Sequence, residues 1–299
     1  MRETYEPKDL FNETKGSINL IGGTLSVDDS VLDKPYSYKM ALVGYFWSGK
    51  HHRVVKGINL ITLYYTDVVG NHFPVSYRVY DKEDGKTKND YFLDMLAEVL
   101  AWGLKPAFVT GDSWYSSVNN LKTVKNHGLG SLFALESNRL VSIEKDKWVA
   151  VQKLDIPDEG LEVWLRDFGQ VKLFRTWLKD EPRHYVVHLA DVTQLSNFQR
   201  KAFCSLHDLH WKIEQYHRVI KQVCNIEHFQ VRSKIPILNH LFAALCGYVY
   251  LQKLCALDVI SNCYRFQRKL FQEVIASFIL EFISDKNHMN PQFLFSVNA

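Results

Sequence analysis

The order of strand-like and helix-like segments constrains the fold of this chain more than any other feature. Two runs rich in β-branched and aromatic residues, 54–66 and 72–80, flank a polar turn at 67–71 and predict a β-hairpin. A shorter strand is expected before them, at 24–28. The later segments are expected to be a helix at 89–102, a strand at 106–112, a helix at 115–127, a strand at 131–136, β-rich sequence at 138–190 and helices from 195 onward. This order predicts an α/β fold in which helices flank a mixed sheet.

Cysteine usage and the length of apolar runs argue against secreted and membrane-spanning classes. The five cysteines all fall in the last third of the chain and include no Cys-x-x-Cys pair, which predicts reduced thiols rather than a disulfide framework. The first ten residues lack the apolar segment of a signal peptide. The longest apolar stretch, 241–251, is too short to cross a bilayer. A cytoplasmic protein with no membrane partner is therefore expected.

Positive charge is concentrated locally, although the whole chain carries only +3. Residues 34–57 hold five Lys or Arg, no acid and five interleaved aromatic residues, and residues 195–235 hold seven Lys or Arg against three acids. Cations with aromatic side chains between them are typical of surfaces that contact DNA. Lys50, Arg53 and Arg232 are therefore predicted to bind DNA. The alternative for 34–57 is a solvated strand whose aromatic side chains belong to the core.

Acidic residues stand at three positions that can converge. Asp28 and Asp29 end the first strand, Asp112 follows the strand that begins at 106, and Glu214 lies within a predicted helix. Such carboxylates are hard oxygen ligands and suit Mg²⁺. Two such ions, about 3.5–4 Å apart, activate a water and stabilise the leaving oxygen in phosphodiester chemistry. The alternative for each acid is an ordinary turn, cap or solvated helix residue.

Three blocks of sequence surround these acids: LSVDDSVLDKPYS at 25–37, FVTGDSWYSS at 108–117 and HDLHWKIEQYHRVIKQVCNIEHFQVRS at 207–233. Together they resemble bacterial insertion-sequence transposases with a DDE catalytic core, in the branch marked by a Y-x2-R-x3-E-x6-K signature. The third block is the most specific, and its matching residues are Trp211, Ile213, Glu214, Lys221, Gln230, Arg232 and Ser233. The resemblance covers about residues 24–255 and implies an RNase H-like core.

The resemblance also implies a role for each acid. Asp28 is similar to the first catalytic Asp, because Ser30 then falls at the family's Ser/Thr position, and Asp29 is the alternative. Asp112 and Glu214 are similar to the second and third catalytic acids. Asp28, Asp112 and Glu214 would then be the ligands of two Mg²⁺ ions, for which Mn²⁺ can substitute.

Further residues of the third block resemble the DNA-contacting positions of the family. Lys221, seven residues after Glu214, is similar to the signature Lys that contacts phosphate at the end of the element. His207 and His210 occupy the Tyr and Arg positions, so the spacing is kept but the identities are not. Histidine lacks the permanent bidentate fork of Arg. Weaker or pH-sensitive binding of the DNA end is expected, or its delegation to Arg218.

On this resemblance the chain is expected to comprise an N-terminal remnant at 1–23, a first core part at 24–137, a β-rich insertion at 138–190, a second core part at 191–260 and a C-terminal helical region at 261–299. Family members commonly carry a helical region that recognises the DNA end before the first strand. Only 27 residues precede Asp28 here. A truncated reading frame or a separately encoded region is therefore expected.

The predicted function is that of a DNA transposase or its catalytic fragment. It would cut DNA at the ends of an insertion sequence and join the freed 3′-OH to target DNA, as a homodimer in the DNA complex, in the bacterial nucleoid. One alternative is a truncated, non-catalytic DNA-binding product that represses intact transposase. Another alternative is an RNase H-type nuclease unrelated to transposition.

Overall fold

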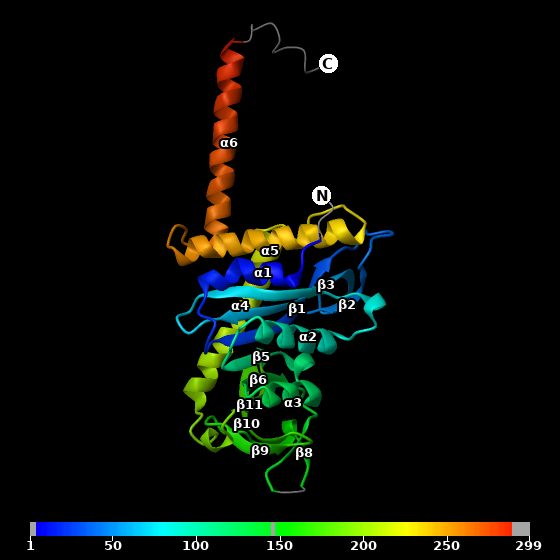
Figure 1. Ribbon diagram of the computed structural model, residues 1–299, viewed down its shortest axis with the longest axis vertical. Helices are drawn as coiled ribbons and strands as arrows, with labels where there is room; N and C mark the ends of the chain where they lie inside the picture. Colours follow the sequence, from blue (N-terminus) through cyan, green and yellow to red (C-terminus); the bar gives the residue numbers. More distant parts are fainter. Residues whose placement is uncertain (1–3, 145–146, 289–299) are drawn as a thin grey trace. The chain divides into compact units, whose positions relative to one another are not determined.

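The computed structural model describes residues 4–144 and 147–288, which form two compact units that meet between residues 250 and 251 of the chain. Within the described residues the first unit is built on one mixed sheet of eleven strands (Figure 1). The strands are β1 (Thr24–Asp33), β2 (Gly44–Ser48), β3 (Arg53–Thr66), β4 (His72–Val79), β5 (Phe108–Gly111), β6 (Gly130–Leu135), β7 (Leu140–Ser142), β8 (Val149–Ala150), β9 (Leu161–Leu165), β10 (Gly169–Leu178) and β11 (Glu181–His188). The sheet order is β2-β3-β1-β5-β6-β11-β10-β9-β7-β8, with β4 also paired to β3.

The central strands have the pairing that the sequence order predicts. β1 is antiparallel to β3 and parallel to β5, and β5 is parallel to β6. β3 and β4 form the expected hairpin, whose turn is held by the Asp67 carboxylate accepting from the backbone N–H groups of Val69 and Asn71. β1 runs five residues beyond the predicted strand 24–28. The polar run that follows reads as a strand end in sequence, yet it stays paired with β3 as far as Asp33.

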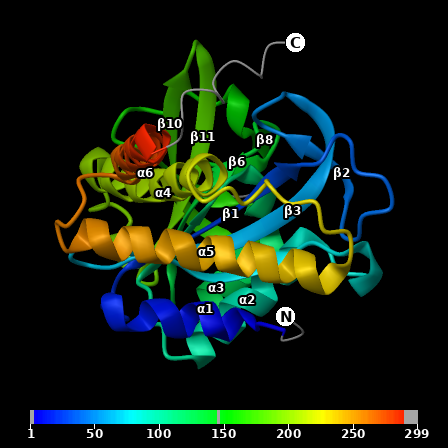
Figure 2. The same ribbon diagram turned by 90° about the horizontal axis from the view of Figure 1, so that it is seen from above.

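Helices cover both faces of this sheet, which confirms the predicted architecture. They are α1 (Pro7–Thr14), α2 (Lys88–Ala101), α3 (Val118–Asn126), α4 (Arg200–Gln222) and α5 (Lys234–Ala256). A further helix, α6 (Cys263–His288), belongs to the second unit. Leu25 and Val27 share a hydrophobic core with residues of α2 and α3. Successive strand residues point to opposite faces, so Ser26 and Asp28 face the other layer, where α4 packs against β1 and β5 (Figure 2). α3 begins three residues later than predicted because Ser117 caps it, accepting from the Asn120 N–H.

The β-rich stretch between β6 and α4 extends the same sheet. β11 pairs antiparallel with β6, and β10, β9, β7 and β8 follow outward. A separate hydrophobic cluster joins this extension to the first turns of α4, where Phe203 stacks on Phe174 with ring centroids 4.6 Å apart. The insertion therefore anchors the N-terminal part of α4.

Residues before β1 contain a helix that the sequence analysis did not predict. α1 begins with Pro7 at its first position and buries Leu10 and Phe11, and Phe11 belongs to the main core. Only two of its eight residues are strongly apolar, so the helical period is hard to detect in the sequence.

Among the described residues, α5 alone is long and apolar enough, by length and composition, to cross a membrane. The predicted apolar stretch 241–251 thus lies inside a longer apolar helix of 23 residues. Core helices pass the same test. Leu241 and Leu245 of α5 are fully buried, and the Tyr248 hydroxyl lies 2.6 Å from that of Tyr64 in β3. Packing within the protein therefore accounts for part of this apolar surface.

Candidate active site

Two of the predicted acids are neighbours because of the register of parallel strands. Val27 of β1 pairs with Gly111 of β5, so the next residues, Asp28 and Asp112, follow at the same edge of that pair. The strands approach closely here, since a Cβ at position 111 would lie 2.9 Å from Val27 Cγ1. The Asp112 carboxylate also caps the short 3₁₀ helix Ser113–Tyr115. The fold therefore brings together two acids that are 84 positions apart in the sequence.

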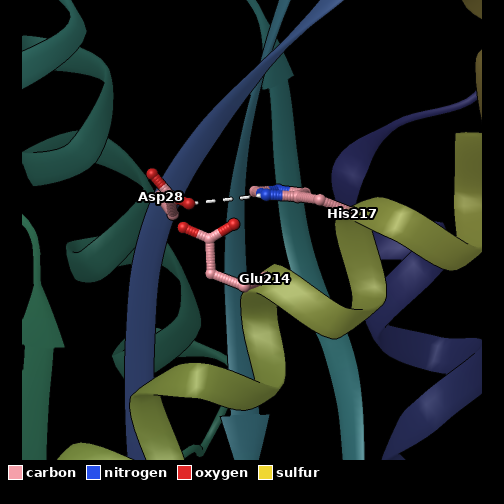
Figure 3. A group of neighbouring side chains, drawn as sticks. All are labelled: Asp28, Glu214 and His217. Carbon is pink, nitrogen blue, oxygen red and sulfur yellow. Dashed lines mark ion pairs between the residues drawn. The ribbon is translucent and has the colours of Figure 1, made fainter. Parts of the chain in front are cut away.

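The third acid, Glu214, approaches Asp28 from α4. Glu214 and His217 lie one helical turn apart on one face of α4, and each offers a ligand atom within 4.8 Å of the others and of an Asp28 oxygen (Figure 3). His217 Nδ1 is 3.4 Å from Asp28 Oδ2, and both side chains are about nine-tenths buried. The sequence analysis missed His217. Its position three residues after Glu214 was the available signal.

The electrostatics of the site favour a bound cation. Burial, and then the neighbouring Asp29, raise the pKa of Asp28 to about 7. Burial and the charges of Asp28 and Asp29 raise the pKa of Asp112 to about 7, and burial with Asp28 raises the pKa of Glu214. Carboxylates whose charged forms are disfavoured in this way gain stability when a cation is shared between them. The donor set therefore fits a divalent metal ion.

Asp29, the alternative to Asp28, has a different environment. It points to the opposite face of β1, where Lys88 Nζ lies 2.8 Å and the Tyr115 hydroxyl 3.0 Å from Asp29 Oδ1. The side-chain amide of Asn59 donates to its other oxygen. The Asp29–Lys88 pair is largely buried. Asp29 is thus occupied by internal partners, and this favours Asp28 as the metal ligand.

Three predicted DNA contacts also have internal partners. Lys221 Nζ donates to the Val31 carbonyl at 2.7 Å and lies 3.6 Å from Glu227 Oε1. His207 lies 3.2 Å from the Tyr185 hydroxyl, and His210 Nδ1 lies 3.1 Å from Thr110 Oγ1. Burial lowers the pKa of both histidines, to about 4 for His210, so neither is a cation at neutral pH. That these three residues contact phosphate stays a prediction. To do so, each would have to give up its present partner within the protein.

The other predicted DNA contacts are exposed. They are Arg218 on α4, Arg232 between α4 and α5, and Lys50 and Arg53 at the turn between β2 and β3. β2 and β3 pair antiparallel across this turn.

On β2 itself, the Tyr45 and Trp47 side chains are 68% and 64% exposed, so these aromatic residues do not belong to the core. The alternative interpretation of 34–57 as a strand with core aromatics is therefore wrong for these two residues. The hairpin offers cations and aromatic faces to the solvent together.

Comparisons with known proteins identify the family and the fold. The sequence model of a family described as a transposase DDE domain matches residues 24–250. Among solved structures, the fold is similar to that in a cryo-EM structure of a piggyBac transposase synaptic complex with hairpin DNA, with a TM-score of 0.52 and 13% sequence identity. That similarity covers 91% of this chain and 55% of the other, so the chain spans about half the length of its structural neighbour. At this identity it shows the fold, which is the predicted RNase H-like one. No curated protein matches the sequence.

Proposed function

Because the chain belongs to the transposase DDE domain family, we propose that it cuts and joins DNA through divalent metal ions held by Asp28, Asp112 and Glu214. One observation carries this proposal: Asp28 of β1 has Glu214 of α4 beside it, and Asp112 directly follows the end of β5 that pairs with β1. Their raised pKa values identify a cluster that lacks an internal counter-cation strong enough to neutralise it.

Each residue has a defined part in this proposal. Asp28 on β1, Asp112 after β5 and Glu214 on α4 would together hold the ions. When bound, two ions supply an activated water and neutralise charge at the scissile phosphate. The three carboxylates must lose their protons as the ions bind, so metal affinity couples to pH. Positioning by the rigid sheet supplies the remaining catalysis.

The proposed substrate is duplex DNA at the two ends of a mobile element, followed by target DNA. The exposed cations Lys50, Arg53, Arg218 and Arg232 are proposed to neutralise backbone phosphates, with Tyr45 and Trp47 beside the first pair. A homodimer is proposed for the DNA complex, because each copy would then process one end.

The proposal is tested by cleavage of a supercoiled plasmid that carries the genomic DNA flanking this gene. With Mg²⁺ or Mn²⁺, the chain is expected to cut at the element boundary and leave a 3′-OH. Asp112→Asn and Glu214→Gln should each lower the rate by at least about 100-fold, because each removes a metal ligand. The matched control is Asp208→Asn, an exposed acid on the same helix as Glu214, which should cleave like the parent chain.

Full cleavage by both metal-ligand variants would overturn the assignment. DNA binding by the parent chain without metal-dependent cleavage would instead support the non-catalytic repressor. Cleavage without preference for the element boundary would support a nuclease unrelated to transposition.

A further inference from the structure

His217 is a buried imidazole in contact with the acids of the proposed metal site. Its residue is 5% exposed, and its side chain lies against Asp28, with Nδ1 3.4 Å from Oδ2. That separation is longer than a normal hydrogen bond between nitrogen and a carboxylate oxygen. The ring of Tyr216 is its aromatic neighbour, at 5.1 Å between centroids. Packing holds the imidazole in place while its contact with Asp28 remains loose.

His217 Nδ1 is the ring nitrogen that faces Asp28, and the second ring nitrogen has no partner within the described part of the chain. Nε2 is buried and has no partner there. A buried polar atom without a partner costs about 1–3 kcal/mol. Histidine in such a setting acquires a partner when a ligand or ion arrives, and a neutral imidazole nitrogen is a common metal ligand.

The arrangement fits a single ion at one of the two proposed metal positions. One atom each of Asp28, Glu214 and His217 lies within 4.8 Å of the other two. Ligands bound at about 2.0–2.2 Å from one ion are separated by no more than about 4.4 Å. A small side-chain rotation would therefore suffice to close the three atoms around an ion.

From this geometry we propose that His217 is a nitrogen ligand of the ion held by Asp28 and Glu214, so that the two metal positions differ in chemistry. This inference rests on the proposed function. The position shared by Asp28 and Asp112 has only oxygen ligands from these residues and suits Mg²⁺. The position with an imidazole favours Mn²⁺ and other first-row transition ions over Mg²⁺.

The competing role for His217 is to position Asp28 by donating a hydrogen bond to it. In that case the imidazole would not bind the metal, and replacing His217 would affect only the position of the Asp28 side chain. A measurement that detects nitrogen bound to the ion separates the two roles, whereas loss of activity would not.

The experiment is pulsed electron paramagnetic resonance of the full chain loaded with Mn²⁺ alone, without DNA. Coupling of Mn²⁺ to a ¹⁴N nucleus is expected in the parent chain and should disappear in His217→Gln. His210→Gln is the matched control, a partly buried histidine two turns earlier on α4, and it should keep the coupling. Titration should also show Mn²⁺ affinity falling by about 10–100-fold in His217→Gln, with Mg²⁺ affinity falling by less than about threefold.

Mn²⁺ bound to the parent chain with no ¹⁴N coupling would overturn the inference while leaving the carboxylate site, and hence the proposed function, intact. The same conclusion follows if His217→Gln keeps the coupling. A parent chain that binds no Mn²⁺ would overturn both proposals. The parent spectrum alone decides the matter if His217→Gln fails to fold.

Discussion

Asp28 and Asp29 are adjacent in the chain but have opposite physical situations. Strand alternation turns Asp28 toward α4, and its carboxylate accepts a hydrogen bond of 2.7 Å from the Asp29 backbone N–H. Asp29 faces α2, and its carboxylate accepts hydrogen bonds from the side chains of Lys88, Tyr115 and Asn59. One acid is thus left with an uncompensated burial cost and the other is neutralised. The buried charge of Asp28 lowers the free energy of unfolding, a cost that is common at functional sites.

Asp28→Asn is expected to stabilise the metal-free protein at alkaline pH. The folded pKa of Asp28 is about 7, against about 3.9 in the unfolded chain, so the folded state binds more protons between these values. The stability associated with this carboxyl is present below pH 4 and is lost as the pH rises through 7. Asparagine carries no charge to bury. The free energy of unfolding of the Asp28→Asn variant at pH 8 should exceed that of the parent chain by roughly 1–3 kcal/mol.

Urea unfolding with a chelator present, at pH 5 and pH 8, measures this difference. The gain should be smaller at pH 5 than at pH 8, because at pH 5 the parent carboxyl is ionised in the unfolded chain but still protonated in the folded one. Asp208→Asn, at an exposed position, should show no such pH dependence. An equal effect of Asp28→Asn at both pH values would contradict the account.

At the scale of elements, local patterns could be predicted and long-range pairings could not. The hairpin β3–β4 and helix α2 follow from periodicity within a few residues, and their predicted bounds differ from the observed ones by one residue or less. The antiparallel pairing of β11 with β6 joins segments about 50 residues apart, and no local signal encodes it. α1 was missed because its short apolar face is confirmed only by packing into the core.

Gly111→Ala tests the close approach of β1 and β5 that sets Asp112 beside Asp28. The added Cβ would meet Phe133 Cε1 at 2.6 Å and Val27 Cγ1 at 2.9 Å, both in the buried core. Separation of the strands should lower the free energy of unfolding by about 1–3 kcal/mol and weaken Mn²⁺ binding, because Asp112 moves with β5. Chemical unfolding and Mn²⁺ titration measure the two effects.

The matched substitution is Gly49→Ala, at a turn position where an added Cβ meets nothing within 4 Å. It should change the free energy of unfolding by less than about 0.5 kcal/mol and leave Mn²⁺ affinity unchanged. Equal behaviour of the two variants would show that the approach of β1 to β5 does not set the geometry of the site.

At the scale of the whole molecule, the unit 1–250 coincides closely with the family match at 24–250 and holds all three proposed catalytic acids. The three acids could be predicted from sequence because each lies in a recognisable block. The internal partners of Lys221, His207 and His210 could not, because those contacts depend on how α4 docks against the sheet. The distribution of surface charge likewise depends on the tertiary structure. The chain as a whole carries only +3, and the exposed cations become significant only where the fold gathers them.

The most direct test of the central claim is a crystal structure of the chain grown with Mn²⁺, with diffraction recorded at the manganese absorption edge. The account predicts anomalous density within bonding distance of Asp28, Asp112 and Glu214, whether or not DNA is present. Manganese bound elsewhere on the protein, with these three carboxylates free of it, would contradict the account.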